Sequence, residues 1–209
     1  MNSEKLKAKK KARNEGRPRY KKTKVGWIPE EWGIKKGDEI SILITKGSSP
    51  KWQGFTYQNN GVLFITSENV RNGFLDISIQ KYLPKEFNEK QRRSILRYDD
   101  ILINIVGASI GRACKYHLSD TSANINQAVC LLRPNKKVDS NFISYYLQHP
   151  LAVRRLLSTQ VDSARPNLTL SDIRIFCFVA PPLSEQEKIA EILSAWDRAI
   201  EQVGKLIDA

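Results

Sequence analysis

The sequence predicts a mixed α+β fold, with a compact domain of short strands and helices followed by one long helix of the coiled-coil type. Short apolar runs recur through residues 34–179 without the regular strand–helix alternation of a βαβ protein. After Pro181 and Pro182, apolar residues recur at steps of three and four to the end of the chain. We therefore expect one domain over residues 25–180 and a spacer or dimerisation helix over residues 181–209.

Composition and charge indicate a soluble globular protein with a basic N-terminal segment. The 209 residues are 41% apolar and 27% charged, which is typical of soluble globular chains, and no apolar run is long enough to span a bilayer. We expect a cytoplasmic protein with no membrane partner. Residues 1–24 hold eleven Lys or Arg and two Glu, a net charge of +9 out of +12 for the whole chain. This predicts a mobile basic arm, either a solvated terminus or a loose tether for a polyanion.

The domain divides into short apolar segments separated by polar loops. The residues favour strands over 34–44, 62–66, 128–132 and 173–179, and a strand pair formed by 95–96 and 101–106 across Tyr98-Asp99-Asp100. Residues 142–157 are predicted to be helical, with a break at Pro150. The loops between these segments are rich in Gly and hydrogen-bonding side chains, and they cover residues 46–54, 67–73, 107–112 and 165–167.

The terminal helix is expected to begin near Ser184, because Ser184 and Glu187 have the spacing of a capping box. Its apolar positions form a seam with a heptad step. Such a seam either packs on its own domain or pairs with a partner helix, and its continuation to the end of the chain favours a partner. The expected partner-binding residues are Ile189, Ile192, Leu193, Trp196, Ala199, Ile200, Val203 and Leu206.

No catalytic or metal-binding constellation is predicted. Cys114, Cys130 and Cys177 never form a CxxC pair, so we expect them to be buried as small hydrophobic residues. The two histidines stand alone, and no phosphate-binding or cofactor motif is present. A nuclease would need Asp99 and Asp100 to share a cation, but adjacent residues of a strand point to opposite faces.

Six segments in a fixed order resemble the specificity (S) subunits of type I restriction-modification systems. Residues 24–32 open the domain with Lys-Val-Gly-Trp-Ile-Pro-Glu-Glu-Trp, and residues 181–189 close it with Pro-Pro-Leu-Ser-Glu-Gln-Glu-Lys-Ile. Between them lie residues 47–50, residues 99–103 leading to the turn at 107–112, residues 125–127 and residues 164–168. Family members usually carry two target-recognition domains and two helices, whereas this chain has one of each.

The resemblance implies a protein that performs no chemistry of its own. It implies binding of half of a bipartite double-stranded DNA target, and docking of modification (M) and restriction (R) subunits. S-adenosylmethionine and ATP would belong to those partners, so no cofactor is expected here. With one recognition domain, the chain would form a homodimer through its terminal helix. A non-specific RNA- or ribosome-associated adaptor is the alternative, and it would show no sequence preference.

Bases are read by side chains that make paired hydrogen bonds, chiefly Arg or Lys with guanine and Asn or Gln with adenine. Some of the loop residues have an equally good structural explanation: Asn72 as a turn, Asn126 and Gln127 as scaffold, and Trp52 as a cover for the core. The residues expected to contact DNA are Lys46, Ser48, Lys51, Trp52, Asn69, Arg71, Asn72, Ser109, Arg112, Asn126, Gln127, Arg165 and Asn167.

Overall fold

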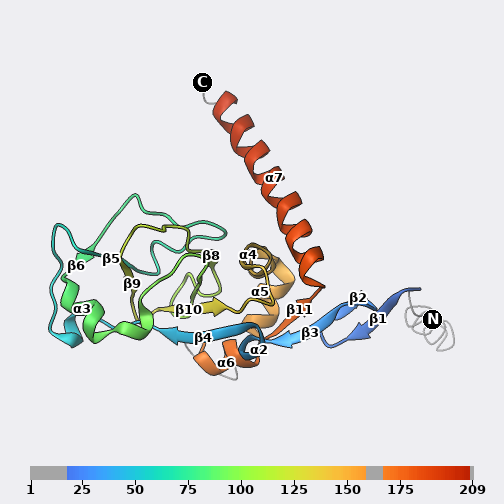
Figure 1. Ribbon diagram of the computed structural model, residues 1–209, viewed down its shortest axis with the longest axis horizontal. Helices are drawn as coiled ribbons and strands as arrows, with labels where there is room; N and C mark the ends of the chain where they lie inside the picture. Colours follow the sequence, from blue (N-terminus) through green and yellow to red (C-terminus); the bar gives the residue numbers. More distant parts are fainter. Residues whose placement is uncertain (1–17, 159–166, 208–209) are drawn as a thin grey trace, which may run out of the picture.

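A computed structural model describes residues 18–158 and 167–207 (Figure 1). It shows a mixed domain of small sheets and short helices from which one long helix projects. In chain order the elements are β1 (Tyr20–Thr23), β2 (Gly26–Pro29), β3 (Gly33–Lys36), α2 (Gly37–Ile40), β4 (Ser41–Lys46), η1 (Lys51–Gln53), β5 (Val62–Ile65), β6 (Tyr82–Leu83), α3 (Lys85–Lys90), η2 (Arg92–Ser94), β7 (Ile101–Asn104), β8 (Ala113–Lys115), β9 (Ala123–Ile125), β10 (Val129–Pro134), α4 (Ser140–Gln148), α5 (Pro150–Leu157), α6 (Leu170–Ile175), β11 (Cys177–Ala180) and α7 (Leu183–Ile207).

The central sheet is antiparallel, in the order β4-β10-β7-β8, and its inner strands β10 and β7 are buried on both faces. Alternate residues of a strand point to opposite faces. Cys130 and Leu132 of β10 therefore join one apolar cluster, whereas Val129 and Leu131 join another. This two-sided burial explains why β10 is apolar along most of its length, as the sequence predicts.

Each face of the central sheet has its own cover. On one side lies the small sheet β6-β5-β9, in which β5 and β9 run parallel with Leu63 opposite Ala123. On the other side α4, α5, α6 and the start of α7 contribute apolar residues to the first cluster. The expected helix over residues 142–157 is confirmed as α4 and α5, which are separated at His149 and Pro150.

Two predicted strands contain a helical turn instead. Residues 34–44 divide into β3, α2 and β4, because the Glu39 carboxylate accepts the Lys36 backbone N–H at 2.7 Å and starts a short helix. Residues 173–179 divide into α6 and β11. The Thr169 hydroxyl accepts the Asp172 N–H at 3.1 Å and the Asp172 carboxylate accepts the Thr169 N–H at 2.8 Å, which forms a capping box.

The predicted strand pair of residues 95–96 with 101–106 is wrong. β7 pairs with β8 across the turn at residues 107–112, whereas Leu96 donates its N–H to Ala123 at the start of β9. Asp99 has a φ of 71° and Asp100 donates its N–H to the Arg97 carbonyl, so the chain makes a tight turn before β7. That turn separates Leu96 from the sheet that β7 enters.

The end of the expected mobile arm is ordered. Residues 20–23 form β1, which pairs with β2 in an antiparallel hairpin, and Gly26 at the start of β2 has a φ of 112°. The Arg155 guanidinium donates to the Val25 carbonyl at 2.5 Å and fastens the hairpin turn to α5. Residues 1–17 of the expected arm lie outside the described residues.

α7 begins at Leu183, one residue before the predicted start, and has two distinct faces. One face rests on the domain. Gln186 is buried there, accepts the Asp139 N–H at 3.0 Å and donates to the Pro181 carbonyl at 2.8 Å. About three turns further along, the Tyr145 hydroxyl donates to the Asp197 carboxylate at 2.6 Å.

The second face of α7 carries the predicted seam. Ile189 packs against the core of the domain, but beyond it the helix projects away from the body of the molecule (Figure 1). Trp196 is 65% exposed and Leu206 is 78% exposed. The other exposed members of the seam are Ile192, Leu193, Ala199, Ile200 and Val203.

The cysteines are free thiols. Cys114 and Cys130 are fully buried, and burial raises the pKa of each thiol to about 12. Cys177 is partly exposed. Within residues 18–158 and 167–207, no helix is both long and apolar enough to cross a bilayer.

A buried ion pair holds the start of β7 against β10. Asp100 is fully buried, and Arg133 donates to its carboxylate through Nε at 2.7 Å and Nη2 at 2.8 Å. The Arg97 N–H donates a third bond at 2.7 Å. Burial raises the pKa of Asp100, and the hydrogen bonds from Arg133 oppose that rise. Asp100 is therefore a structural carboxylate, and Asp99 pairs separately with Lys115 at 3.2 Å.

Replacing Arg133 with Ala leaves Asp100 buried without its cation. We expect a loss of about 3–5 kcal/mol in the free energy of unfolding, measured by urea denaturation. Lys137 is an exposed cation nearby, and Lys137→Ala should change stability by less than about 0.5 kcal/mol. Equal effects of the two substitutions would contradict this account of the ion pair.

Candidate functional site

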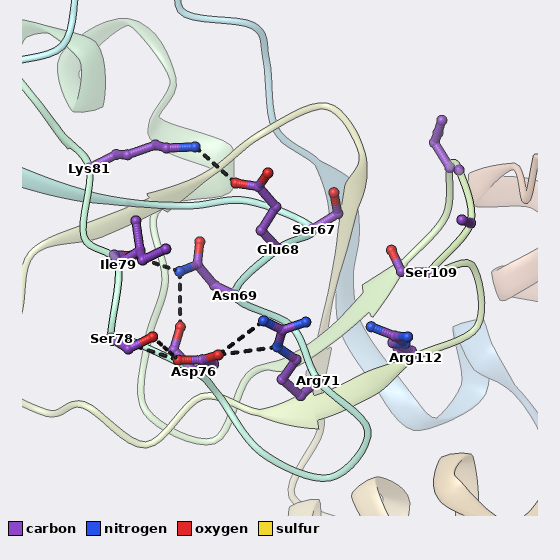
Figure 2. A pocket seen from close by; sticks show the side chains of 13 residues that line it. Ser67, Glu68, Asn69, Arg71, Asp76, Ser78, Ile79, Lys81, Ser109 and Arg112 are labelled. Atoms are coloured by element: carbon purple, nitrogen blue, oxygen red, sulfur yellow. Dashed lines mark hydrogen bonds and ion pairs between the residues drawn. The ribbon is translucent and has the colours of Figure 1, made fainter.

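A polar groove opens between two loops at one end of the central sheet. Its two walls are the loop over residues 66–81, which follows β5, and the turn over residues 106–112, which joins β7 to β8. The groove has a volume of about 460 Å³. Figure 2 shows its lining side chains, which come from Ser67, Glu68, Asn69, Arg71, Asp76, Ser78, Ile79, Lys81, Val106, Gly107, Ala108, Ser109 and Arg112.

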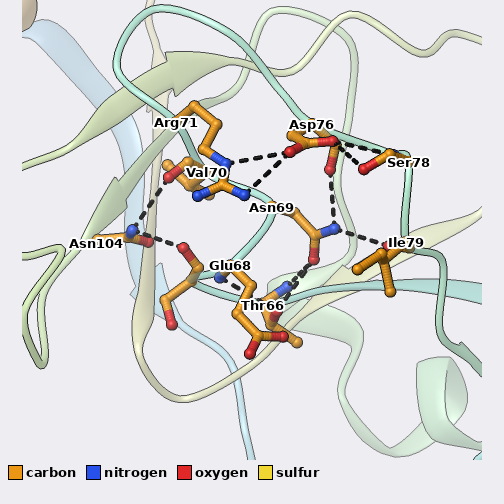
Figure 3. Close-up of polar contacts among 10 residues, drawn as sticks. Thr66, Glu68, Asn69, Val70, Arg71, Asp76, Ser78, Ile79 and Asn104 are labelled. Carbon is orange, nitrogen blue, oxygen red and sulfur yellow. Dashed lines mark hydrogen bonds and ion pairs between the residues drawn. The ribbon is translucent and has the colours of Figure 1, made fainter.

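Asn69 shapes the first wall. Its side chain is almost fully buried, and its Oδ1 accepts the Thr66 N–H at 2.9 Å. Its Nδ2 donates to the carbonyls of Asp76 and Ile79 at 2.9 and 3.1 Å. Figure 3 shows these bonds closing the loop on itself. The amide of Asn69 is therefore engaged within the loop.

Two ion pairs neutralise most of the charge on this wall. Arg71 donates to the Asp76 carboxylate through Nε at 3.2 Å and approaches it through Nη2 at 3.1 Å. Hydrogen bonds from Ser78, together with that from Arg71, lower the pKa of Asp76. Lys81 contacts Glu68 at 2.9 Å, and its hydrogen bond and charge lower the pKa of Glu68. Both carboxylates are thus ionised and paired near neutral pH.

Arg112 stands on the opposite wall with Ser109 (Figure 2). Its side chain is exposed, and among the described residues it has no hydrogen bond or ion pair of its own. The turn that carries it is tight, because Gly107 and Gly111 have φ values of 86° and 84°. Of the described residues, three cations and two carboxylates line the groove, and Arg112 is the cation that they leave free for an external acceptor.

The predicted DNA-contact residues are only partly gathered at this groove. Asn69, Arg71, Ser109 and Arg112 line it, and Asn167 forms a backbone bridge with Val106 beside it. Asn72 lies in a neighbouring depression between Arg112 and α5. Arg165 lies outside the described residues.

The remaining candidates belong to the segments around residues 46–54 and 126–127. Lys46 ends β4, Lys51 and Trp52 lie in η1, and Trp52 is 80% exposed, so it does not cover the core. Ser48 accepts a hydrogen bond from Gln53 at 3.0 Å. The Asn126 side chain accepts the Ala128 N–H at 3.0 Å, and Gln127 follows it with a buried Oε1 that has no partner in the described protein.

Sequence reasoning missed four polar residues that build the groove. Glu68, Asp76 and Lys81 form its ion pairs, and Asn104 connects its walls from beneath. Asn104 could have been found from the sequence, because it is the one polar side chain in the apolar run of residues 101–106. The ion pairs depend on the path of a long loop, which local pattern does not specify.

The chemistry of the groove is that of recognition. Its groups are hydrogen-bond donors and acceptors around a guanidinium that has no partner among the described residues. The Ser78 hydroxyl donates to the Asp76 carboxylate at 2.6 Å, but the lowered pKa of Asp76 makes this carboxylate a weak base. In the part of the chain that the structure describes, no three His, Cys, Asp or Glu residues are grouped to hold a metal ion. A planar polar ligand with acceptor atoms fits this arrangement.

A family model described as the type I restriction modification DNA specificity domain matches residues 29–208. Two relatives are a putative type I restriction enzyme MjaX specificity subunit from Methanocaldococcus jannaschii, 28% identical, and the EcoKI specificity subunit from Escherichia coli, 26% identical. The alignments cover 90% and 81% of this chain but only 45% and 37% of those relatives.

Solved structures agree on the fold. The HsdS subunit from Thermoanaerobacter tengcongensis superposes with a TM-score of 0.59 over 90% of this chain and 43% of its own, at 18% identity. A chain from a structure of type I restriction-modification complex assembly gives a TM-score of 0.62 at 21% identity, over 86% of this chain and 40% of its own. The chain thus spans less than half the length of the relatives and structures it matches.

Two asparagines of the loop over residues 66–81 allow a matched test of its construction. Asn69→Ala leaves buried backbone groups without partners, so we expect a loss of about 1–3 kcal/mol in the free energy of unfolding. Asn72 is exposed, and Asn72→Ala should have an effect within about 0.5 kcal/mol. Thermal and urea unfolding of both variants measure the difference, and an unchanged Asn69→Ala protein would refute this assignment.

Proposed function

Because the chain belongs to the type I restriction-modification DNA specificity family, we propose that it recognises one half of a bipartite DNA target and docks modification and restriction subunits. The observation that carries this proposal is the polar groove, in which the exposed Arg112 guanidinium has no partner among residues 18–158 and 167–207. Guanidinium groups recognise guanine by bidentate hydrogen bonds to O6 and N7 in the major groove.

The proposal gives different roles to the two arginines of the groove. Arg71 is partly exposed but already holds Asp76, so breaking that pair would offset part of what a new contact contributes. Arg112 has no such competitor among the residues that the structure describes. We therefore assign base reading to Arg112 and shaping of the wall to Arg71. Lys46, Lys51 and the exposed Trp52 are assigned to contacts outside the groove, with phosphates or with the edge of the duplex.

No catalytic role is assigned to this chain. Its relatives are named specificity subunits, and the carboxylate next to the Ser78 hydroxyl, Asp76, is paired with Arg71 and has a lowered pKa, so it is a weak general base. Methylation and cleavage, with their S-adenosylmethionine and ATP, are assigned to the partner subunits. On this assignment the chain needs no cofactor of its own.

The exposed face of α7 is assigned to a second copy of the chain. The domain contacts another face of α7, where Gln186 bonds to Asp139 and Asp197 bonds to Tyr145 of α4. The seam from Ile192 to Leu206 is therefore free to pair without disturbing the domain. A two-fold, antiparallel pair would place two recognition domains at opposite ends of the helices. Protein symmetry would then require an interrupted palindrome in the DNA.

The test of base reading is a binding comparison on two duplexes. A duplex enriched by the wild-type chain from a randomised library serves as the preferred site, and a scrambled duplex serves as the reference. Arg112→Ala should lose about 1–3 kcal/mol on the preferred duplex and relax its preference at one position. Arg93→Ala removes an exposed cation on η2, away from the groove, and should cause only a small, sequence-independent loss.

Two results would count against this assignment. A uniform loss by Arg112→Ala on all duplexes would make it a phosphate contact. Equal binding of the wild type to every duplex would favour the non-specific adaptor instead.

The dimer is tested by sedimentation. Ile192→Asp with Trp196→Asp places two charges in the seam, so we expect the variant to be monomeric where the wild type sediments as a dimer at tens of micromolar. Arg198→Asp with Gln202→Asp alters the polar face of the same helix and should leave the dimer intact. A wild-type chain that stays monomeric would refute the pairing.

A further inference from the structure

Asn104 lies beneath the polar groove and bonds to both of its walls. It is the last residue of β7 and is fully buried. Its Nδ2 lies 2.9 Å from the Ser67 carbonyl and 3.3 Å from the Val70 carbonyl, both on the first wall. The same nitrogen lies 3.0 Å from Ser109 Oγ on the second wall. Figure 3 shows the contacts of Asn104 with the first wall.

The backbone of Asn104 holds the residues next to the free guanidinium. Its N–H donates to the Arg112 carbonyl at 2.8 Å, and its carbonyl accepts the Gly111 N–H at 2.8 Å. The main chain of Arg112 is thus fixed directly by Asn104. Because the Arg112 side chain has no partner in the part of the chain that the structure describes, its position depends on this backbone anchor and on the shape of the turn.

Few other bonds connect the two walls. The Gly73 N–H donates to the Ala113 carbonyl at 2.9 Å, which ties the far end of the loop to β8. Near the groove itself, residues 66–70 and the turn at 107–112 are connected in the described structure by Asn104, which bonds to both of them. The Oδ1 atom of Asn104 is buried and has no hydrogen-bond partner in the described protein, so only the donor side of this amide is used.

We propose that Asn104 is a positioning residue for sequence recognition: it holds the two walls in register and so places Arg112 against a guanine edge. This inference rests on the proposed function. A bidentate contact tolerates displacements of only about 0.5 Å, so a shift of the turn reduces discrimination even when Arg112 is present. Asn104 itself touches no base.

The test measures the ratio of affinities for the preferred and scrambled duplexes defined above. Asn104→Ala should lower this ratio about tenfold, with little change in binding to the scrambled duplex. Asn104→Ser retains one donor and should recover part of the ratio. Ser109→Ala removes a single, partly buried contact of Asn104, and it should fold normally and lower the ratio by a smaller factor.

Asn124→Ala is the matched control for a purely structural effect. Asn124 is also fully buried, but its Nδ2 bonds to Asn88 and the Gln91 carbonyl, which are not part of the groove. We expect Asn124→Ala to lower the melting temperature as Asn104→Ala does while leaving the affinity ratio at the wild-type value. A matching loss of ratio in both variants would overturn the proposal.

A double variant tests whether Asn104 acts through Arg112. If it does, Asn104→Ala with Arg112→Ala should discriminate no worse than Arg112→Ala alone. Additive losses would refute the positioning role, and so would a wild-type ratio in both Asn104→Ala and Ser109→Ala. These outcomes differ from failure of the proposed function, in which the wild-type chain itself enriches no duplex.

Discussion

The burial of β10 on both faces is the constraint from which the rest of the domain follows. A strand with apolar side chains on alternating faces needs a cover on each side. The helices supply one cover and the β6-β5-β9 sheet supplies the other. The parallel pairing of β5 with β9 sets where the loop over residues 66–81 begins, and the pairing of β7 with β8 sets where the turn at residues 107–112 lies. The polar groove is the space between these two connections.

Buried polar residues at the two ends of β7 connect the loops to the rigid central sheet. Asp100 and Arg133 fasten the start of β7 to β10, and Asn104 at its other end holds both walls of the groove. A recognition surface made of loops needs such support, because loops have few packing contacts of their own. β7 thus combines an apolar middle with polar anchors at its two ends.

Local pattern in the sequence was sufficient for the long elements. Residues 142–157 have a helical period with a proline at the break, and the run of residues 128–132 is confirmed within β10. The short helices α2 and α6 were missed because side-chain caps, and not apolar periods, create them. The strand pair at residues 95–106 was wrong because β7 pairs with β8 and Ile95 bridges to Asn124 of β9, and both of these partners lie further along the chain.

The pairing of β3 with β11 has a consequence for how the domain is made. Gly33 lies opposite Ala180, so the two ends of the domain meet in one small sheet at the base of α7. Contacts across such a separation raise the contact order and are slow to form, because nearly the whole chain must be arranged first. During synthesis β3 has no strand to pair with until Ala180 has left the ribosome. The domain therefore closes only after β11 has been synthesised, and the start of α7, which covers the same core, follows β11 directly in the chain.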